Sequence, residues 1–149
     1  MQMQYQILSP LAKAPARATE GSAGLDLTAA LPTPSSIPSG ARALIPTGIA
    51  VALEPGTVGL VFARSGLATK HGIALSNGVG VIDSDYRGEV RVGLVNLSEE
   101  AYVIEPGERI AQLVVVPICM PEPVLVEKLP ETGRGAGGFG STGRMGDGR

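Results

Sequence analysis

Glycine and proline interrupt this chain so often that long helices have almost no room to form. The sequence of 149 residues contains 21 Gly and 12 Pro, and its longest stretch without either spans only residues 94–105. Glycine inside a helix costs conformational entropy, and proline removes a backbone hydrogen bond. The chain is therefore expected to consist mainly of short strands joined by turns.

Short runs in which apolar and polar residues alternate indicate many β-strands. About ten strands in a single domain predict an all-β fold, namely a sandwich, a jelly roll or a barrel. At most one short helix is expected, near residues 66–71, and residues 31–40 are expected to form a surface loop. The predicted strands lie at residues 5–8, 25–28, 49–53, 58–62, 73–75, 79–82, 90–94, 102–104, 110–116 and 124–126.

Composition excludes several classes of protein. A net charge of −2 argues against a general nucleic-acid binder. The single cysteine, Cys119, allows neither a disulfide framework nor a cysteine-based zinc site, and its apolar neighbours predict that it is buried. No signal-peptide pattern and no apolar run of about 20 residues is present, so we expect a cytoplasmic protein with no membrane partner. The shortage of large aromatic residues, with no Trp and two Phe, favours an oligomer that shares its core.

The last twenty residues, 130–149, are rich in glycine and are expected to form a flexible tail after a domain at residues 1–129. The tail suits a phosphate ligand, because glycine N–H groups approach anions closely and Arg134 can make a bidentate contact. Ser141 and Thr142 add hydroxyl groups, and Phe139 can lie on a flat ring. These features predict a nucleotide lid, and the alternative is a linker without a role.

Four polar segments between the apolar runs carry further candidate residues. Asp26 lies between two leucines, and Arg64 and Ser65 follow a strand at the start of the expected helix, where they can hold phosphate. Gln112 alternates with apolar residues on a strand and offers both a donor and an acceptor. The ordinary structural interpretations are a solvated strand face and a helix cap.

Residues 77–89 predict a hairpin-like pocket that accepts a pyrimidine nucleotide. The amide of Asn77 and exposed backbone groups can read the donor and acceptor edge of the base, and Tyr86 can pack on the sugar. Asp83 follows an apolar run and can act as a general base toward water. The ordinary interpretation is a turn rich in Asp and Gly.

Taken together, the five segments resemble the five motifs of the trimeric deoxyuridine triphosphate nucleotidohydrolases, the dUTPases. The resemblance runs from residue 23 to residue 143, and the strings at 82–88 and 139–143 are highly specific. The matching strings are AGLDL, RSGLA, NGVGVIDSDYRGE, GERIAQL and RGAGGFGSTG.

The resemblance implies a β jelly roll that forms a homotrimer with active sites at the subunit interfaces. One subunit would supply motifs one, two and four to a site, another would supply motif three, and the remaining subunit would lend its tail. The implied reaction is the Mg²⁺-dependent hydrolysis of dUTP to dUMP and pyrophosphate, which supports dTMP synthesis and keeps uracil out of DNA.

Roles for individual residues follow from the same resemblance. Asp83 would activate the water that attacks the α-phosphorus, and Asp26 would organise the waters around Mg²⁺. Asn77 and the hairpin backbone would read uracil, while Tyr86 would pack on deoxyribose and exclude a 2′-hydroxyl. The remaining substrate-binding residues would be Arg64, Ser65, Gly66, Gly80 and Gln112 in the domain, and Arg134, Phe139, Gly140, Ser141 and Thr142 in the tail.

Two other functions are compatible with this type of fold. A dCTP deaminase binds a related nucleotide, but it would need an acid/base glutamate in the pocket where this sequence has Asp83. A non-enzymatic, nucleotide-sensing or capsid-like β module would have lost Asp83 or the tail.

Overall fold

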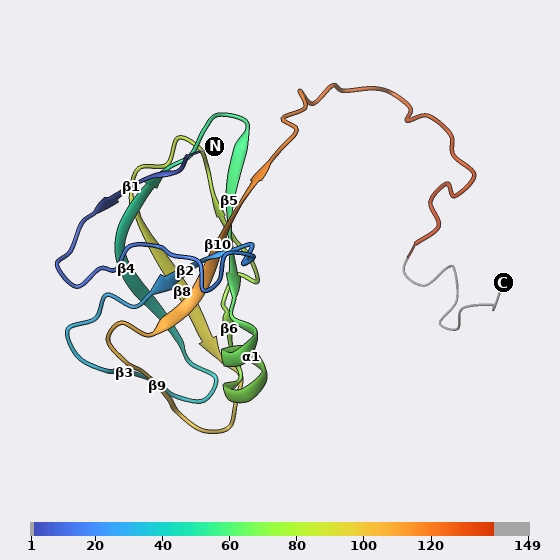
Figure 1. Ribbon diagram of the computed structural model, residues 1–149. Helices are drawn as coiled ribbons and strands as arrows, with labels where there is room; N and C mark the ends of the chain where they lie inside the picture. Colours follow the sequence, from blue (N-terminus) through green and yellow to red (C-terminus); the bar gives the residue numbers. More distant parts are fainter. Residues whose placement is uncertain (1, 139–149) are drawn as a thin grey trace.

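Two four-stranded β-sheets enclose a hydrophobic core in the computed structural model, which describes residues 2–138 (Figure 1). One sheet has the strand order β1-β4-β8-β6, the other has the order β2-β10-β5-β7, and a two-stranded ribbon, β3-β9, completes the fold. All neighbouring strands are antiparallel. The strands are β1 (Gln4–Ile7), β2 (Leu25–Thr28), β3 (Ser35–Ile37), β4 (Arg42–Ala52), β5 (Thr57–Ala63), β6 (Ile73–Leu75), β7 (Gly80–Ile82), β8 (Glu89–Asn96), β9 (Tyr102–Ile104) and β10 (Arg109–Pro117).

The alternating strands bury one face each, as their sequences predict. In β8 the side chains of Val90, Val92 and Leu94 are buried, whereas Glu89 and Arg91 on the opposite face remain partly or fully exposed. Such burial contributes roughly 25 cal/mol per Å² of apolar surface removed from water. The facing sheet adds Leu27, Val61, Ile110 and Leu113 to the same core. The all-β, jelly-roll-like fold class is therefore confirmed.

One helix, α1 (Ser65–His71), follows β5 and confirms the predicted short helix. Leu67 anchors it to the core, and Gly72 ends it with a φ of 67°, a left-handed conformation that favours glycine. A Cβ atom at Gly72 would also lie 2.8 Å from the backbone nitrogen of Ser98. Leu67 thus fixes the helix near its beginning and Gly72 fixes its end. The first residues of the helix lie at the end of β5.

Strand β4 is longer than the sequence predicts. Only residues 49–53 alternate clearly, because Pro46 and Gly48 rarely occur inside a strand. The structure accommodates both at a bulge, where the register with β8 shifts between Pro46 and Ala50 and Gly48 adopts a φ of 68°. The strand therefore continues through residues that would usually end it.

The predicted surface loop at residues 31–40 is wrong in part, because it contains β3. Ile37 in this short strand is only 1% exposed, and the strand pairs with β9. The fully buried Asn96 donates hydrogen bonds from Nδ2 to the carbonyl oxygens of Ile37 and Glu100, at 2.8 and 2.7 Å. Three residues are too few to show an alternating pattern, and this is why the strand was not predicted.

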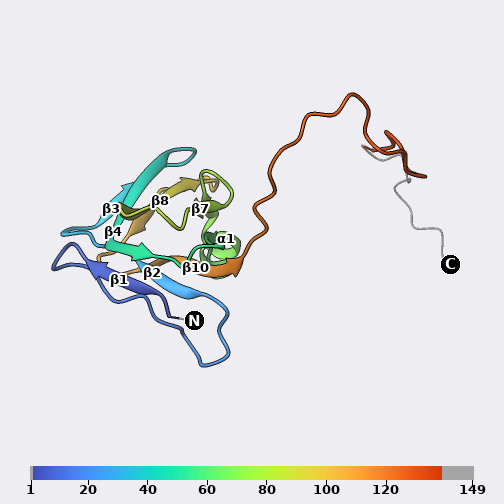
Figure 2. The same ribbon diagram turned by 90° about the horizontal axis from the view of Figure 1, so that it is seen from above.

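The predictions of a strand at residues 124–126 and of a buried Cys119 are both wrong. After β10, the chain runs away from the two sheets, as both views show (Figures 1 and 2). Val124 and Leu125 are 76% and 99% exposed, and Cys119 is exposed too. Apolar sequence alone does not bury a segment that runs away from the two sheets. The helix described within residues 2–138, α1, has only seven residues and cannot span a membrane.

Candidate active site

A polar pocket of about 250 Å³ forms where β2, β5, β10 and the start of α1 meet. Its lining brings together five residues that are far apart in the sequence and were predicted to bind substrate or to organise metal-bound water, namely Asp26, Arg64, Ser65, Gly66 and Gln112. We call it the polar pocket; it is lined by Ala18, Ser22, Gly24, Asp26, Arg64, Ser65, Gly66 and Gln112.

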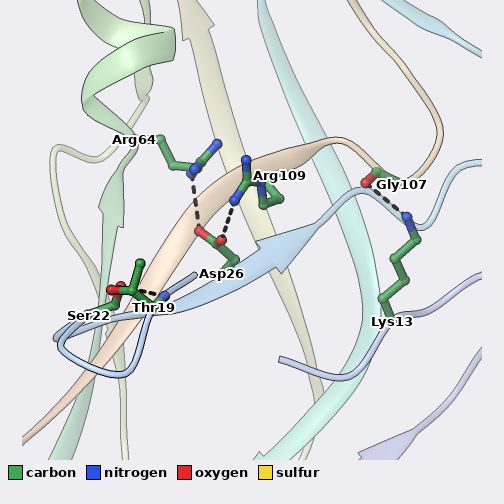
Figure 3. Close-up of polar contacts among 7 residues, drawn as sticks. All are labelled: Lys13, Thr19, Ser22, Asp26, Arg64, Gly107 and Arg109. Carbon is green, nitrogen blue, oxygen red and sulfur yellow. Dashed lines mark hydrogen bonds and ion pairs between the residues drawn. The ribbon is translucent and has the colours of Figure 1, made fainter. Parts of the chain in front are cut away.

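Asp26 is held between two arginines in this pocket (Figure 3). Its Oδ1 atom lies 3.1 Å from Nε of Arg64, and its Oδ2 atom lies 3.1 Å from a terminal nitrogen of Arg109. Only 15% of the Asp26 side chain is exposed, and its backbone N–H donates to the carbonyl oxygen of Ala16 at 2.8 Å. One carboxylate between two guanidinium groups leaves a net charge of about +1, which favours an anionic ligand.

Gln112 lies directly opposite Asp26 in the β2–β10 pairing. Its Nε2 atom donates to the carbonyl oxygen of Ala63 at 3.1 Å, which fixes the plane of the side-chain amide. Gly24 makes this position possible, because a Cβ atom there would lie 2.7 Å from Oε1 of Gln112. The second Nε2 hydrogen remains available to a ligand in the pocket.

Ser65 and Gly66 occupy the first two positions of α1, and both are exposed. Arg64 precedes them in an extended conformation and does not cap the helix with its side chain, which pairs with Asp26 instead. A Cβ atom at Gly66 would meet no atom within 4 Å, so its backbone is open to a ligand. The end of β5 thus presents a guanidinium, a hydroxyl and exposed backbone side by side.

A second pocket, of about 370 Å³, lies along β7, the following turn and β8. We call it the hairpin pocket. Four of the residues that were predicted to bind the nucleoside or activate water line it, namely Asn77, Gly80, Asp83 and Tyr86. Its other walls are mainly apolar and include Val61, Leu75, Ile82, Val90 and Val92.

The turn after β7 fixes Asp83 and Tyr86 relative to one another. The backbone N–H of Tyr86 donates to the carbonyl oxygen of Asp83 at 3.2 Å, and the Tyr86 hydroxyl donates to the carbonyl oxygen of Glu89 at 3.0 Å. A Cβ atom at Gly88 would lie 2.6 Å from Cζ of Tyr86, so the ring can occupy this position only over a glycine. Asp83 itself is exposed and faces water.

The two pockets have no lining residue in common. Within one chain, the structure therefore groups the candidate residues of motifs one, two and four and separates them from those of motif three. Arg134 lines neither pocket, and Phe139, Gly140, Ser141 and Thr142 lie outside the described residues. Within residues 2–138, no group of three or more His, Cys, Asp or Glu side chains could hold a metal ion.

A family model for dUTPase matches residues 11–143, which cover most of the chain. The chain belongs to the dUTPase family. The five motifs predicted from the sequence all lie within the matched segment. The family resemblance inferred from those motifs is therefore confirmed.

Relatives with the name deoxyuridine 5'-triphosphate nucleotidohydrolase align with nearly the whole chain. The protein of Desulfitobacterium hafniense is 54% identical over 132 residues, which cover 88% of this chain and 87% of the relative. The protein of Ralstonia nicotianae is 48% identical over 147 residues, which cover 97% of this chain and 99% of the relative.

Solved dUTPase structures share the fold. A mutant dUTPase of Staphylococcus bacteriophage 80alpha with dUpNHpp superimposes with a TM-score of 0.88 at 32% identity, covering 95% of this chain and 98% of the phage chain. A mutant dUTPase of phage phi11 of S. aureus, described with a structural Mg(II) ion, superimposes with a TM-score of 0.80 at 27% identity, covering 88% and 100% of the two chains.

Three residues that shape the two candidate pockets were not among the predicted site residues. Arg109 holds Asp26, while Gly24 and Gly88 make room for Gln112 and Tyr86. Arg109 was not among the candidate residues, because its contact with Asp26 depends on the pairing of β2 with β10. No local sequence signal identifies such a contact, since the two residues are 83 positions apart.

A polar cluster outside both pockets connects α1 to β9. The Tyr102 hydroxyl donates to Glu108 at 2.6 Å, and the Tyr102 ring lies 4.9 Å from the ring of His71 at the end of α1. Burial, together with the hydrogen bond and the negative charge of Glu108, raises the pKa of Tyr102 to about 12. The cluster thus joins Tyr102 on β9 to His71, which is the last residue of α1.

Proposed function

We propose that this chain hydrolyses dUTP to dUMP and pyrophosphate through attack of water on the α-phosphorus. Membership of the dUTPase family over residues 11–143 carries the proposal. In the cell, this reaction would supply dUMP for dTMP synthesis and keep uracil out of DNA. The expected compartment is the cytoplasm, without a nucleic-acid or membrane partner.

The hairpin pocket binds deoxyuridine in this proposal. Gly80 has no side chain, which leaves the backbone accessible to the edge of a flat base, while the amide of Asn77 reads that edge. The Tyr86 ring packs on the sugar and leaves no room for a 2′-hydroxyl. The bond from Tyr86 to the Glu89 carbonyl supports this role, because it fixes the ring before substrate arrives.

Asp83 accepts the proton of the attacking water. As the new O–P bond forms at the α-phosphorus, the bond to the pyrophosphate leaving group breaks, and the water proton passes to the carboxylate. Exposure of Asp83 at the edge of the hairpin pocket supports this role, because a base must reach both water and the α-phosphorus.

The polar pocket binds the phosphates. Arg64 contacts Asp26 through Nε, which leaves its two terminal amino groups free for phosphate oxygens. The Ser65 hydroxyl, the Gly66 backbone and the free hydrogen on Gln112 Nε2 add neutral donors. Arg64 offsets part of the negative charge of the phosphates, and the neutral donors help to orient the phosphate chain.

Mg²⁺ fits the polar pocket only when it arrives with the triphosphate. Bound to phosphate oxygens and waters, it would neutralise the charge that repels an incoming nucleophile. Each Asp26 oxygen is held by one arginine and retains capacity to accept a hydrogen bond from a metal-bound water. The net positive charge of the cluster disfavours a free cation, so Asp26 acts through water and not as a direct ligand.

The tail, residues 130–149, closes over the site after a catalytic domain formed by residues 1–129. Arg134 binds the γ-phosphate, with help from Gly140, Ser141 and Thr142, and Phe139 covers the uracil. The glycine-rich sequence supports this role, because it allows backbone N–H groups to approach the phosphates.

A homotrimer completes the site in this proposal. The polar and hairpin pockets of one chain share no residue, which supports a site whose phosphates and nucleoside bind to two different chains. The segment after β10 also needs a cover, since its apolar side chains are exposed in the isolated chain. They are Ile118, Met120, Val124, Leu125, Val126 and Leu129.

Incubation with dUTP or dCTP in the presence of Mg²⁺ tests the function. Release of pyrophosphate from dUTP, without ammonia from dCTP, is the expected result. Ammonia from dCTP would indicate a deaminase, and neither product would indicate a non-enzymatic module; either outcome would overturn the proposal. EDTA should abolish pyrophosphate release, and added Mg²⁺ should restore it.

A further inference from the structure

The beginning of the tail forms a compact turn around Arg134. The backbone N–H of Gly135 donates to both the carbonyl oxygen and the Oγ1 atom of Thr132, at 3.0 and 3.1 Å. The backbone N–H of Gly137 donates to the carbonyl oxygen of Arg134 at 3.1 Å. In return, Nε of Arg134 donates to the carbonyl oxygen of Gly137 at 2.7 Å. Residues 132–137 are thus linked by four hydrogen bonds.

These bonds orient the guanidinium before any ligand arrives. Nε of Arg134 is engaged by the Gly137 carbonyl, so the terminal amino groups of the guanidinium remain available for an anion. A free arginine side chain loses rotational entropy when it binds a phosphate, and prior ordering reduces that loss. Gly135 supports the turn with a φ of 51°, a conformation that a side chain would disfavour.

We propose that Thr132 is a positioning residue for Arg134, and that its hydroxyl keeps the turn in the conformation that grips the γ-phosphate. The inference rests on the proposed function, because it assigns the ligand of Arg134. Two side chains make hydrogen bonds inside the turn, those of Arg134 and Thr132. Thr132 is therefore suited to hold the turn around Arg134. Its hydroxyl oxygen accepts a hydrogen bond from the backbone N–H of Gly135, the residue that follows Arg134.

The expected effect is a weaker grip on the triphosphate without slower chemistry. The net contribution of one hydrogen bond corresponds to a factor of about two to ten in an equilibrium constant. Thr132→Val keeps the shape and removes the hydroxyl, so KM for dUTP should rise by about two- to ten-fold. Saturating dUTP restores the ordered turn by population shift, so kcat should change less than about two-fold.

Ligands with and without a γ-phosphate separate positioning from a general loss of structure. In the full-length protein, Thr132→Val should weaken inhibition by dUpNHpp by the same factor as it raises KM. It should leave inhibition by dUDP, which lacks the γ-phosphate, unchanged. Thr132→Ser should restore wild-type values, and Thr33→Val, on an exposed residue that lines neither pocket, serves as the matched control.

A double substitution completes the test. If Thr132 acts through Arg134, then Thr132→Val should add no further loss in an Arg134→Ala background. Equal losses for dUpNHpp and dUDP, or fully additive losses with Arg134→Ala, would overturn the inference. An unchanged KM in Thr132→Val would do so as well. Failure of the wild-type protein to hydrolyse dUTP would instead refute the proposed function, so the two failures are distinguishable.

Discussion

At the scale of single residues, the carboxylate of Asp83 carries the chemistry of the proposed reaction. Asp83→Asn keeps the shape of the side chain and removes the base. We expect kcat to fall by about 10²–10⁴-fold, because a positioned general base contributes that much. Binding of dUpNHpp should stay nearly unchanged, since the residue contacts water and not the phosphates.

Steady-state kinetics and calorimetry with dUpNHpp measure the two effects separately. Asp85→Asn removes a charge from the same turn outside the hairpin pocket and provides the control. An Asp83→Asn protein with kcat within a few-fold of the wild type would remove this residue from its role.

Gly88 determines where the neighbouring Tyr86 ring can lie, and this position should govern the choice of sugar. The wild-type protein should hydrolyse UTP much more slowly than dUTP. Gly88→Ala would place a methyl group 2.6 Å from Cζ of Tyr86 and displace the ring. We expect the ratio of kcat/KM for dUTP over UTP to fall by about ten-fold, the effect of a small change in pocket shape.

Competition assays with the two nucleotides measure this ratio. Gly21→Ala is a suitable control, because a Cβ atom at Gly21 meets nothing within 4 Å. An unchanged ratio in Gly88→Ala would mean that the ring does not read the sugar.

Residue chemistry was easier to predict from the sequence than residue contacts were. Asp26, Arg64 and Gln112 were selected as separate polar residues on different segments, and they line the same pocket. Arg109 was not selected as a site residue, because its ion pair with Asp26 depends on the β2–β10 pairing. Local patterns identify chemical groups, whereas long-range pairing decides which groups meet.

At the scale of elements, the tail is the segment whose removal has the clearest expected result. Truncation from Gly133 onward should leave the fold intact, because the core lies within residues 27–113. It should strongly reduce binding and turnover of dUTP, since Arg134 and the closure that excludes water are lost.

Circular dichroism tests whether the truncated protein keeps its fold, and activity assays test whether it loses dUTP turnover. Truncation after Arg144 keeps all the motif residues and should behave like the full chain. If the protein truncated at Gly133 hydrolyses dUTP at the full rate, the tail is only a linker.

Elements with clear alternation were predicted well, and the others were not. Strand β8 alternates over its length and was found with nearly the right bounds. Strand β3 is too short to show a pattern, and β4 passes through Pro46 and Gly48 at a bulge. Residues 124–126 have a strand-like sequence but no strand partner among the described residues, and a partner is what a strand requires.

At the scale of the whole molecule, assembly should be a condition of activity. We expect the wild-type protein to sediment as a trimer, at about three times the chain mass of 15.2 kDa. The two pockets of one chain share no residue, and apolar side chains after β10 lack a cover. Leu125→Asp should shift the equilibrium toward monomers and reduce activity in parallel, because it places a charge on a surface that the trimer buries.

Analytical ultracentrifugation and activity assays at the same protein concentrations measure this coupling. Thr33→Asp provides the control, because Thr33 is exposed and lines neither pocket. Val81 on β7 is also exposed, but it lines the hairpin pocket, so Val81→Asp is unsuitable as a control. A fully active monomer would contradict the shared site.

The separation of the two pockets has a genetic consequence. A chain with a defective Asp83 still carries an intact polar pocket, and a chain with a defective Arg64 still carries an intact hairpin pocket. If each site pairs the polar pocket of one subunit with the hairpin pocket of the next, every mixed trimer of these two chains contains one wild-type pairing. Two alleles that are each inactive alone would then complement one another in the same cell.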